Sequence, residues 1–472
     1  MGRKGTGKMR AKRYIMACVL FCTLLICGST VIASAEENNE KNNGEYRYKE
    51  VERPYPYKVK VGDTYIECGD GICLVKYLGD EAEVVVPSEI DGKPVTVIGS
   101  GCFSGNQTIT RVEIPESVTW LDGFNDCSNL ADIKLSNGVK VIGVFSFENC
   151  GSLEKIDLPD SLVCIGAGSK ECGTFTGCSN LKEISFSNNL QEIGPGAFRY
   201  CKALEKVVLP EKVEWVRDYC FFGCSSLKAV EMPENCKKIG HAAFGNCQSL
   251  EYVDLPDSVT NMMSRAFEGC SSLKSIHLSK NLKTIYTGAF QNCSSLEEIT
   301  IPAGVTNIGK MWMGKSGHVF SGCTSLKRVT INGKIQAVRR RTFEWCKALE
   351  TIELPASVTK IGEGAFIGCK SLETIKLPSG VERICIDAFR GCGLKEITFP
   401  ESLQMVGRRS FAHCESLKKI VIKGKNARIG SLAFKNIAKN AVFDVPNTAV
   451  NIYRSRLTKK NTGFVVKSMK VV

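Results

Sequence analysis

The feature that most constrains this fold is a column of cysteines at a constant spacing. Thirteen of them, between residues 127 and 414, follow one another at intervals of 23 residues, with three exceptions. The column consists of Cys127, Cys150, Cys178, Cys201, Cys224, Cys247, Cys270, Cys293, Cys323, Cys346, Cys369, Cys392 and Cys414. A Phe lies three residues before each of them, and the Phe column continues to Phe434. Such a period is typical of a tandem repeat array.

The copies follow, with substitutions, the template C-x-x-L-x-x-I-x-L-P-x-x-V-x-x-I-G-x-x-A-F-x-x-C, as residues 346 to 369 illustrate. The Ile and the second Leu, two positions apart, predict the buried side of a short strand. Pro follows, for example Pro256, and ends the strand because it has no N–H to donate. The Val and the Ile-Gly pair then line the turn and the return path. The Ala-Phe pair supplies the bulk that fills each coil.

A single coil of this kind cannot bury its own apolar side chains, so the coils must stack on their neighbours. Adjacent strands are then expected to pair in parallel, about 4.8 Å apart. The predicted fold is a repeat solenoid, a right-handed superhelix with short parallel β-strands on one face. Mostly irregular or short-helical segments are expected on the other face.

The repeat resembles the BspA-like (Treponema-type, 23-residue) leucine-rich repeats of bacterial surface proteins. The matching residues are Leu250, Val253, Leu255, Pro256, Val259, Ala266, Phe267 and Cys270 in one copy, and Leu349, Ile352, Leu354, Pro355, Val358, Ile361, Gly362, Ala365, Phe366 and Cys369 in another. The resemblance implies a secreted or cell-surface location and a role in binding rather than catalysis. The implied role is adhesion to the extracellular matrix, to other bacteria or to host receptors, and it does not imply one ligand.

The two ends of the chain differ from the repeats. Basic residues, an apolar run from Ile15 to Ile32 and an Ala-Ser-Ala segment predict a secretory signal peptide, with a retained N-terminal anchor as the alternative. The predicted organisation is a signal peptide at 1–35, a flexible lead at 36–54, an N-terminal capping region with a degenerate repeat at 55–103, tandem repeats at 104–436, and a C-terminal cap with a basic tail at 437–472. Asp91-Gly92 is expected to form a hairpin turn, and a final strand followed by a short helix is expected in the C-terminal cap.

The distribution of charge argues against nucleic-acid binding. The formal net charge is +13, and removal of the signal peptide, with six basic and no acidic residues, leaves +7. Six further basic residues follow Asp444 without an acid among them, so the repeats are close to neutral. A nucleic-acid binder would carry its basic stripe on the folded face. The basic tail is expected either to contact an anionic envelope weakly or to be a solvated terminus.

The cysteines of the column are expected to be structural. Cys is a small, mostly buried residue with a weak S–H donor, and one Cys per coil does not supply the paired ligands that zinc requires. The four His residues are scattered and form no recognisable constellation with the thiols. We therefore predict no catalytic residue, no metal site and no cofactor. Outside the column, the pairs Cys68–Cys73 and Cys164–Cys172 bracket short segments and are the predicted disulfides.

Two columns of strand residues are expected to face the solvent. The residue after each repeat Leu alternates in sign over nine copies, which predicts ion pairs between neighbouring coils. This column reads Glu154, Lys182, Glu205, Lys228, Glu251, Lys274, Glu297, Lys327 and Glu350. In the second column Asp254 and His277, with Tyr252 beside Asp254, form a candidate contact patch because aromatic residues are enriched at contact hot spots. An ordinary mixed surface is the alternative.

Two copies are longer than 23 residues, by five residues within 165–175 and by seven within 308–320. Both insertions fall between the Ile-Gly pair and the Phe, and insertions in solenoids map to loops on one face. In the second, Met311, Trp312, Met313 and His318 are candidate contact residues, since Trp and Met suit adaptable contacts. The alternative is a tolerated bulge in which Trp312 folds back on the coil.

Three functions remain open at this point. We predict a secreted or cell-surface interaction protein that binds a protein or glycan ligand as a monomer. A structural role in the cell wall or surface layer is the alternative, and an enzyme-associated module is the least favoured. The sequence contains no G-x-S-x-G, H-E-x-x-H or phosphate-binding loop.

Overall fold

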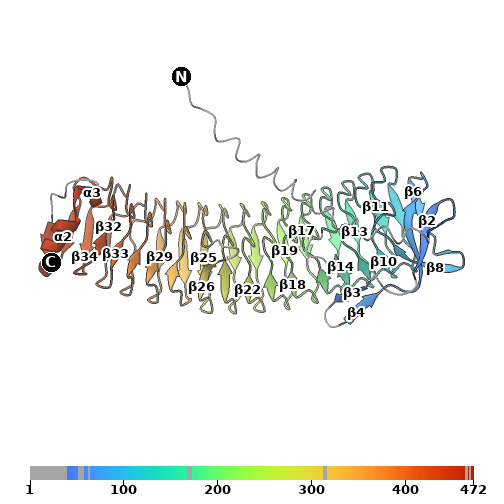
Figure 1. Ribbon diagram of the computed structural model, residues 1–472, viewed down its shortest axis with the longest axis horizontal. Coiled ribbons are helices and arrows are strands. Elements are labelled where there is room, and N and C mark those ends of the chain that lie inside the picture. Colours follow the sequence, from blue (N-terminus) through green and yellow to red (C-terminus); the bar gives the residue numbers. More distant parts are fainter. Residues whose placement is uncertain are drawn as a thin grey trace, which may run out of the picture.

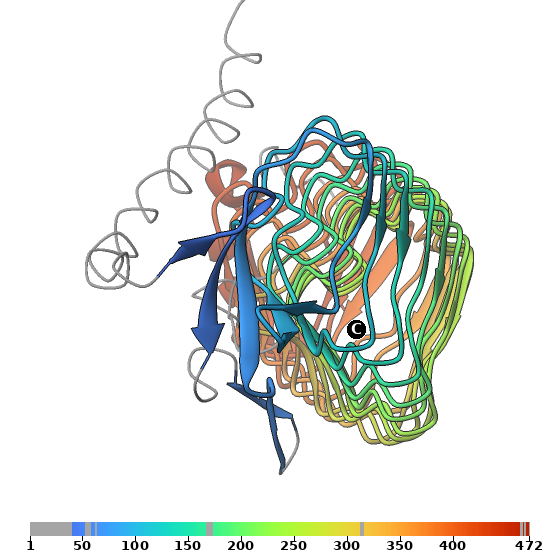
Figure 2. The ribbon, with the colours of Figure 1, turned by 90° about the vertical axis from the view of Figure 1, so that its right-hand side faces the viewer.

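The structure, a computed structural model, describes residues 40–51, 58–61, 64–166, 173–311, 316–462, 466 and 469–471. These residues wind into a straight stack of coils with a cap at each end (Figure 1). Seen along the stack, successive coils lie behind one another around one continuous core (Figure 2). The predicted repeat solenoid is confirmed, whereas the predicted signal peptide at residues 1–35 lies outside the described residues.

One face of the stack carries the predicted strands. These first-face strands pair in parallel in groups of two to four. They are β6 (Glu83–Val85), β9 (Arg111–Glu113), β11 (Asp132–Lys134), β13 (Lys155–Asp157), β15 (Glu183–Ser185), β17 (Lys206–Val208), β19 (Ala229–Glu231), β21 (Tyr252–Asp254), β23 (Ser275–His277), β25 (Glu298–Ile301), β27 (Arg328–Ile331), β29 (Thr351–Glu353), β32 (Glu396–Phe399), β34 (Lys419–Ile422) and β36 (Val442–Val445). In β21, for example, Val253 is buried between exposed Tyr252 and exposed Asp254.

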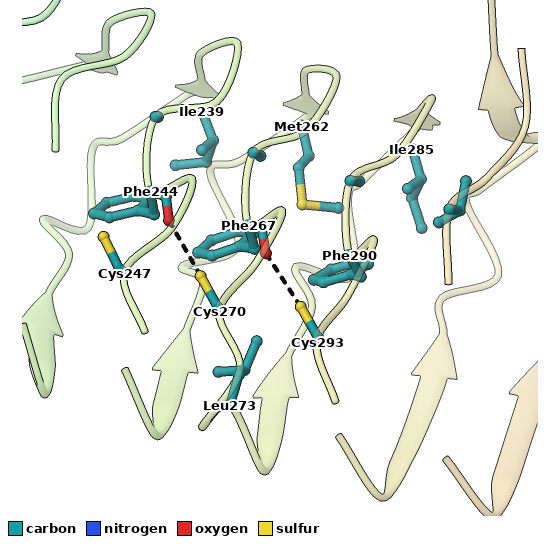
Figure 3. Close-up of a cluster of buried hydrophobic side chains, with 14 of the residues drawn as sticks. Ile239, Phe244, Cys247, Met262, Phe267, Cys270, Leu273, Ile285, Phe290 and Cys293 are labelled. Atoms are coloured by element: carbon teal, nitrogen blue, oxygen red, sulfur yellow. Dashed lines mark hydrogen bonds between the residues drawn. The ribbon is translucent and has the colours of Figure 1, made fainter. Parts of the chain in front are cut away.

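The opposite face is more regular than expected, because short strands replace the expected irregular or helical segments. Each coil crosses this face at its Ile-Gly pair or at the equivalent residues, and neighbouring strands again pair in parallel. The second-face strands are β8 (Lys93–Ile98), β10 (Trp120–Leu121), β12 (Val141–Ile142), β14 (Cys164–Ile165), β16 (Glu192–Ile193), β18 (Trp215–Val216), β20 (Lys238–Ile239), β22 (Asn261–Met262), β24 (Thr284–Tyr286), β26 (Asn307–Lys310), β28 (Ala337–Val338), β30 (Lys360–Ile361), β31 (Arg383–Ile384), β33 (Met405–Val406) and β35 (Arg428–Ile429). Ile239, Met262 and Ile285 point from this face into the core (Figure 3).

The core is built around the Phe column. Fifteen rings, from Phe103 to Phe434, stack nearly parallel with centroids 4.8 to 5.8 Å apart. The column begins one coil earlier than the Cys spacing indicated, because no Cys follows Phe103 at that position. Such stacking adds a specific geometry to the burial of large apolar side chains.

Each cysteine of the column is buried beneath the next turn. Its Sγ donates to the carbonyl of the Phe in the preceding coil at 2.9 to 3.2 Å, as Cys270 does to Phe244 (Figure 3). The thiol thus satisfies a buried backbone acceptor while filling a small apolar space. The expected structural role of these cysteines is confirmed.

The N-terminal cap begins earlier than predicted. Residues 36–54 were expected to be a flexible lead, but β1 (Lys41–Asn42) and β2 (Tyr46–Val51) lie there, and β2 pairs antiparallel with β5 (Gly71–Tyr77). The prediction is wrong because Tyr46, Tyr48 and Val51 bury one side of a strand whose neighbours in the sequence are polar. β5 pairs in parallel with β8 and so starts the second-face ladder.

Two hairpins complete this cap. β7 (Glu89–Ile90) and β8 are joined by the predicted Asp91-Gly92 turn, in which φ is 52° and 74°. Positive φ at both central residues is what a two-residue type I′ turn requires. β3 (Lys58–Val61) and β4 (Thr64–Glu67) form the other hairpin, which projects beside the N-terminal coils (Figures 1 and 2). We call it the covering hairpin, because its Val59 and Val61 pack on the outside of the second face.

The C-terminal cap contains the predicted final strand, β36, and the predicted short helix. The elements after β36 are η3 (Asn447–Ala449), α2 (Val450–Arg456), α3 (Lys459–Thr462) and β37 (Met469–Val471). β37 was not predicted, and it returns to pair in parallel with β36.

The segment expected to be a basic tail is therefore folded over most of its described length. Tyr453 is buried, and its hydroxyl donates to the Gly424 carbonyl at 2.7 Å. Several cations of this cap remain exposed, namely Arg454, Lys459 and Lys460. A contact with an anionic envelope stays a prediction, now for a folded cap rather than a loose terminus.

Candidate functional site

The alternating charges of the first face form the predicted ion pairs. Four pairs, with N···O distances of 2.8 to 3.1 Å, join Glu154 to Lys182, Glu205 to Lys228, Glu251 to Lys274, and Glu297 to Lys327. In each, the Lys contacts the Glu of the coil before it. All eight side chains are exposed, so the pairs contribute little stability each. They keep the strand face neutral over a long distance.

The ion pairs coincide with the closest backbone pairing. The four couples lie beside the paired strands β13–β15, β17–β19, β21–β23 and β25–β27. Within one couple, the Lys274 N–H donates to the Glu251 carbonyl at 2.9 Å, whereas the Glu251 N–H lies 3.4 Å from the Lys228 carbonyl of the couple before. From β13 to β23 the first face is thus a series of paired coils, and from β25 to β29 three strands pair together.

Tyr252, Asp254 and His277 come together on this face. His277 Nδ1 lies 2.7 Å from Asp254 Oδ1, and Tyr252 is 50% exposed. With β19, their strands line an open groove of about 670 Å³, which we call the acidic groove. Its acidic lining residues are Glu231, Glu234, Glu251, Asp254 and Asp257.

Neighbouring lysines and partial burial set the electrostatics of the acidic groove. A hydrogen bond from Lys274 lowers the pKa of Glu251, and one from Lys280 lowers the pKa of Asp257. Partial burial, and then the charge of Asp254, raise the pKa of Tyr252, so its hydroxyl stays a neutral donor. The groove therefore offers carboxylates that are largely paired with cations beside an exposed aromatic ring, a combination suited to binding through hydrogen bonds.

A backbone hydrogen bond joins the two ends of the second insertion. The Gly317 N–H donates to the Gly309 carbonyl at 3.1 Å, which leaves residues 310–316 as the seven added residues. Gly317 has a φ of 93°, and a Cβ there would lie 1.8 Å from the Arg340 carbonyl oxygen, so only Gly fits. Met311 is 57% exposed and available for contact. Trp312 and Met313 lie outside the described residues, so their predicted contact role stays a prediction.

His318 belongs to the regular coil rather than to the inserted loop. It lies two residues before Phe320, at a position with positive φ that Arg265 and Arg341 also occupy in their coils. Its Nδ1 is 3.8 Å from Glu344, and the side chain is 26% exposed. Burial, followed by the nearby cations Arg341 and Arg340, lowers the pKa of His318. His318 is therefore a weaker contact candidate than Met311.

The predicted disulfides fall on one small cluster and on the first insertion. Cys68 and Cys73 are both buried in a cluster beneath the covering hairpin, and both are free thiols in the structure. Cys164 is buried on β14 in the same cluster, and Cys172 lies outside the described residues. Both pairings stay predictions.

The thiols of the column are poorly suited to nucleophilic or redox chemistry. Burial raises the pKa of Cys127 to about 11, and that of Cys178 and Cys270 to about 12. The thiolate, rather than the thiol, is the reactive form, and it is scarce at such values.

A cluster of aromatic side chains around Arg199 lies in the turns that precede the first-face strands, and it was not predicted from the sequence. The Arg199 guanidinium lies 4.9 Å from the ring centroid of Tyr200, and 5.5 Å from those of Tyr219 and Phe222. Tyr200 precedes Cys201 at a position with positive φ where most copies have Gly or Asn. The bulky Tyr200 at this position could have indicated the cluster, because residues in strained backbone conformations are often found at functional sites.

Comparison with protein families identifies the repeat. A model described as a BspA type leucine-rich repeat region, with six copies, matches residues 96–228, 191–318, 316–392 and 361–462. The chain belongs to the BspA-type leucine-rich repeat family. The resemblance inferred from the repeat template is thereby confirmed over most of this BspA-type chain.

Of three similar solved structures, the first supports the fold. A leucine-rich repeat protein from Bacteroides ovatus is 26% identical with a TM-score of 0.60, covering 82% of this chain and 98% of that one. The Treponema pallidum leucine-rich repeat protein is 36% identical with a TM-score of 0.36, covering 39% and 87%. A leucine-rich cell surface protein from Faecalibacterium prausnitzii is 23% identical with a TM-score of 0.45, covering 90% and 98%.

A comparison of this BspA-type chain with curated proteins finds no match. In the part of the chain that the structure describes, no helix has the length and hydrophobicity needed to span a bilayer.

Proposed function

We propose that this BspA-type protein acts outside the cell as a scaffold that binds a protein or glycan ligand and so mediates adhesion. The observation that carries the proposal is the acidic groove, where Tyr252 stands half exposed beside Asp254 and His277. A Tyr held among polar partners is characteristic of contact hot spots. Because the strands fix these side chains before binding, little ordering is required on association.

The charge of the groove indicates the kind of segment it receives. Four of its five carboxylates already lie beside a cation, since Glu231, Glu251 and Asp257 pair with lysines and Asp254 lies next to His277, so the groove presents paired charges and hydrogen-bonding groups to a polar ligand segment. The acidic groove is open rather than enclosed, which suits a segment of a macromolecule better than a small molecule.

The experiment is a binding screen of the chain from residue 36 to 472 against purified extracellular-matrix proteins and bacterial-surface polysaccharides. Tyr252→Ala is expected to lower the affinity for the bound ligand about tenfold, which is the usual effect of removing an aromatic side chain at a contact hot spot. Tyr65→Ala is the matched control, because Tyr65 is 60% exposed on the covering hairpin, away from the groove. Equal losses in both variants, or no ligand in the panel, would contradict the proposal.

The inserted loop is a second candidate contact, supported by exposed Met311. Deleting residues 310–316 joins Gly309 to Gly317, which already lie within hydrogen-bond distance, and restores a 23-residue coil. Retained binding by this variant, together with loss in Tyr252→Ala, would assign the contact to the acidic groove alone.

The extracellular location is tested separately. Expressed with its own N-terminus in a secreting bacterial host, the protein is expected in the medium or on the cell surface with Glu36 as its first residue. N-terminal sequencing that finds Met1 on cell-associated protein would instead support the retained anchor.

A further inference from the structure

A second groove lies on the opposite face of the stack, towards the C-terminal end. It runs over β28, β30, β31 and β33, and its volume is about 430 Å³. Its cationic lining residues are Arg339, Arg340, Lys360 and Arg383, and we call it the basic groove. Ser316, at the end of the second insertion, lies at its border.

The cations of the basic groove are largely uncompensated. Glu363 is the one acid among its lining residues, and it pairs with Arg340 at 3.4 Å. Within the described parts of the chain, Arg339, Lys360 and Arg383 form no ion pair. This is the reverse of the first face, where exposed lysines are matched with a Glu from the neighbouring coil.

The groove presents its cations in register along the stack. Lys360 is the direct strand partner of Arg383, and Arg383 is the partner of Met405. Such partners are about 4.8 Å apart. Met405 and Ile386, which are 38% and 42% exposed, add apolar surface beside the row of cations. Arg339 is held in place by a hydrogen bond to the Asn307 side chain at 3.3 Å.

We propose that the basic groove binds a linear anionic polysaccharide, one bearing carboxylate or sulfate groups, laid along the axis of the stack. Arg presents a planar fork of donors that matches carboxylate and sulfate oxygens. The apolar surface of Met405 and Ile386 faces the C–H side of a sugar ring. The proposal concerns a different face from the acidic groove and does not depend on its ligand.

Other anionic polymers fit this surface less well. In an extended acidic peptide, side chains on one face recur about every 6.8 Å, which does not match a ladder of about 4.8 Å. A peptide that adds a strand needs an open sheet edge, and β30 and β31 are each paired on both sides. Single-stranded nucleic acid is bound by stacking on aromatic side chains, and none occurs among the described lining residues.

The test is calorimetric titration of the chain from residue 36 to 472 with size-defined oligosaccharides. Heparin fragments carry sulfates and carboxylates, polygalacturonate fragments carry carboxylates alone, and dextran is neutral. At least one of the two anionic oligosaccharides is expected to bind, with an affinity that falls as salt is added, and dextran is expected not to bind. Which of the two binds more tightly distinguishes sulfate from carboxylate recognition.

The decisive variant is Lys360→Gln with Arg383→Gln, which is expected to weaken binding about tenfold. The matched control is Lys395→Gln with Lys418→Gln. It removes the same charge from nearby coils, but on the first face. Circular dichroism establishes that both variants are folded. Tyr252→Ala is expected to leave anionic-glycan binding unchanged, which separates this test from that of the acidic groove.

Three outcomes would overturn the proposal. The first is an equal loss of affinity in the control variant, which would indicate non-specific attraction to net charge. The second is tighter binding of polyglutamate or oligodeoxythymidine than of either anionic oligosaccharide. The third is binding of neither anionic oligosaccharide at low salt.

Discussion

Two stretches of the second face share one backbone but differ in what their outward side chains meet. From β5 to β14 the outward residues are Cys73, Val97, Trp120, Val141 and Cys164, and the covering hairpin buries them. From β28 to β35 they are Ala337, Lys360, Arg383, Met405 and Arg428, and the strands lie open to solvent except for partly buried Ala337. Strand pairing therefore fixes the position of each outward residue. Whether the covering hairpin lies over that position decides whether the residue is apolar and buried or, in most cases, polar and exposed.

The difference shows how a repeat array gains local identity. The inward residues of both stretches are alike, because every coil packs on the same Phe column. A hairpin of the N-terminal cap adds a small second core to the outside of five strands only. Beyond its reach the equivalent positions vary, and from β30 to β35 three of the four are exposed cations, namely Lys360, Arg383 and Arg428.

The largest expected effect comes from placing a carboxylate in each stretch. Val141→Asp buries a charge without a partner beneath the covering hairpin, and we expect it to cost about 3 kcal/mol or more. Ala337→Asp, in the open stretch, is expected to change stability by less than about 0.5 kcal/mol. Chemical denaturation followed by circular dichroism measures both. Similar losses in the two variants would contradict the comparison.

A partly buried carboxyl makes the covered stretch sensitive to pH. Asp122 accepts hydrogen bonds from Trp120 Nε1 at 3.0 Å and Ser146 Oγ at 2.9 Å, and burial raises its pKa to about 6. Because the folded chain holds this proton more tightly than the unfolded chain, the contribution is fully present below about pH 4. It is lost as the pH rises through 6.

Asp122→Asn is therefore expected to stabilise the protein by about 1 to 3 kcal/mol at pH 8, with little effect at pH 4. Denaturation midpoints between pH 4 and 8 test this. Glu363→Gln, an exposed acid of the open stretch, is the control and is expected to follow the wild-type profile. Parallel profiles for Asp122→Asn and wild type would show that Asp122 is not the group responsible.

The predicted Cys68–Cys73 disulfide sharpens the comparison further, since it would fasten the covering hairpin to β5. Closing so short a loop contributes about 2 kcal/mol. Mass spectrometry of an unreduced digest is expected to find the two peptides linked, and reductant is expected to lower the stability of the wild type. Recovery of both as free thiols would remove the prediction.

The smallest effect is expected for exposed charges. Lys360→Gln, which removes an unpaired cation of the open stretch, and Lys228→Gln, which removes the pair with Glu205, are both expected to leave the denaturation midpoint unchanged within error. A marked loss in Lys360→Gln would mean that this residue serves folding rather than binding.

Much of the fold was predictable because its signals are local and repeated. The Phe and Cys columns, the first-face strands and the Asp91-Gly92 turn each follow from residues within one coil. The ion pairs followed from reading one column along the chain. The Phe stack was also correct apart from its start at Phe103.

The remainder depended on contacts between distant segments. The burial of Trp120 and Val141 requires a hairpin some 60 to 80 residues earlier in the chain. Strand β2 was not predicted because polar residues separate and surround its three buried apolar side chains, so the whole segment was interpreted as flexible. The basic groove was missed because its cations come from three coils, at second-face positions that the first-face columns do not include.

The most direct test of the account is hydroxyl-radical footprinting of the protein, alone and with the anionic oligosaccharide that binds most tightly. Free protein is expected to be oxidised rapidly at Met405 and slowly at Trp120, which is 9% exposed. Added oligosaccharide is expected to protect Met405 and leave Trp120 unchanged. Rapid oxidation of Trp120 in the free protein, or undiminished oxidation of Met405 with ligand bound, would contradict the division of this face into a covered and a binding stretch.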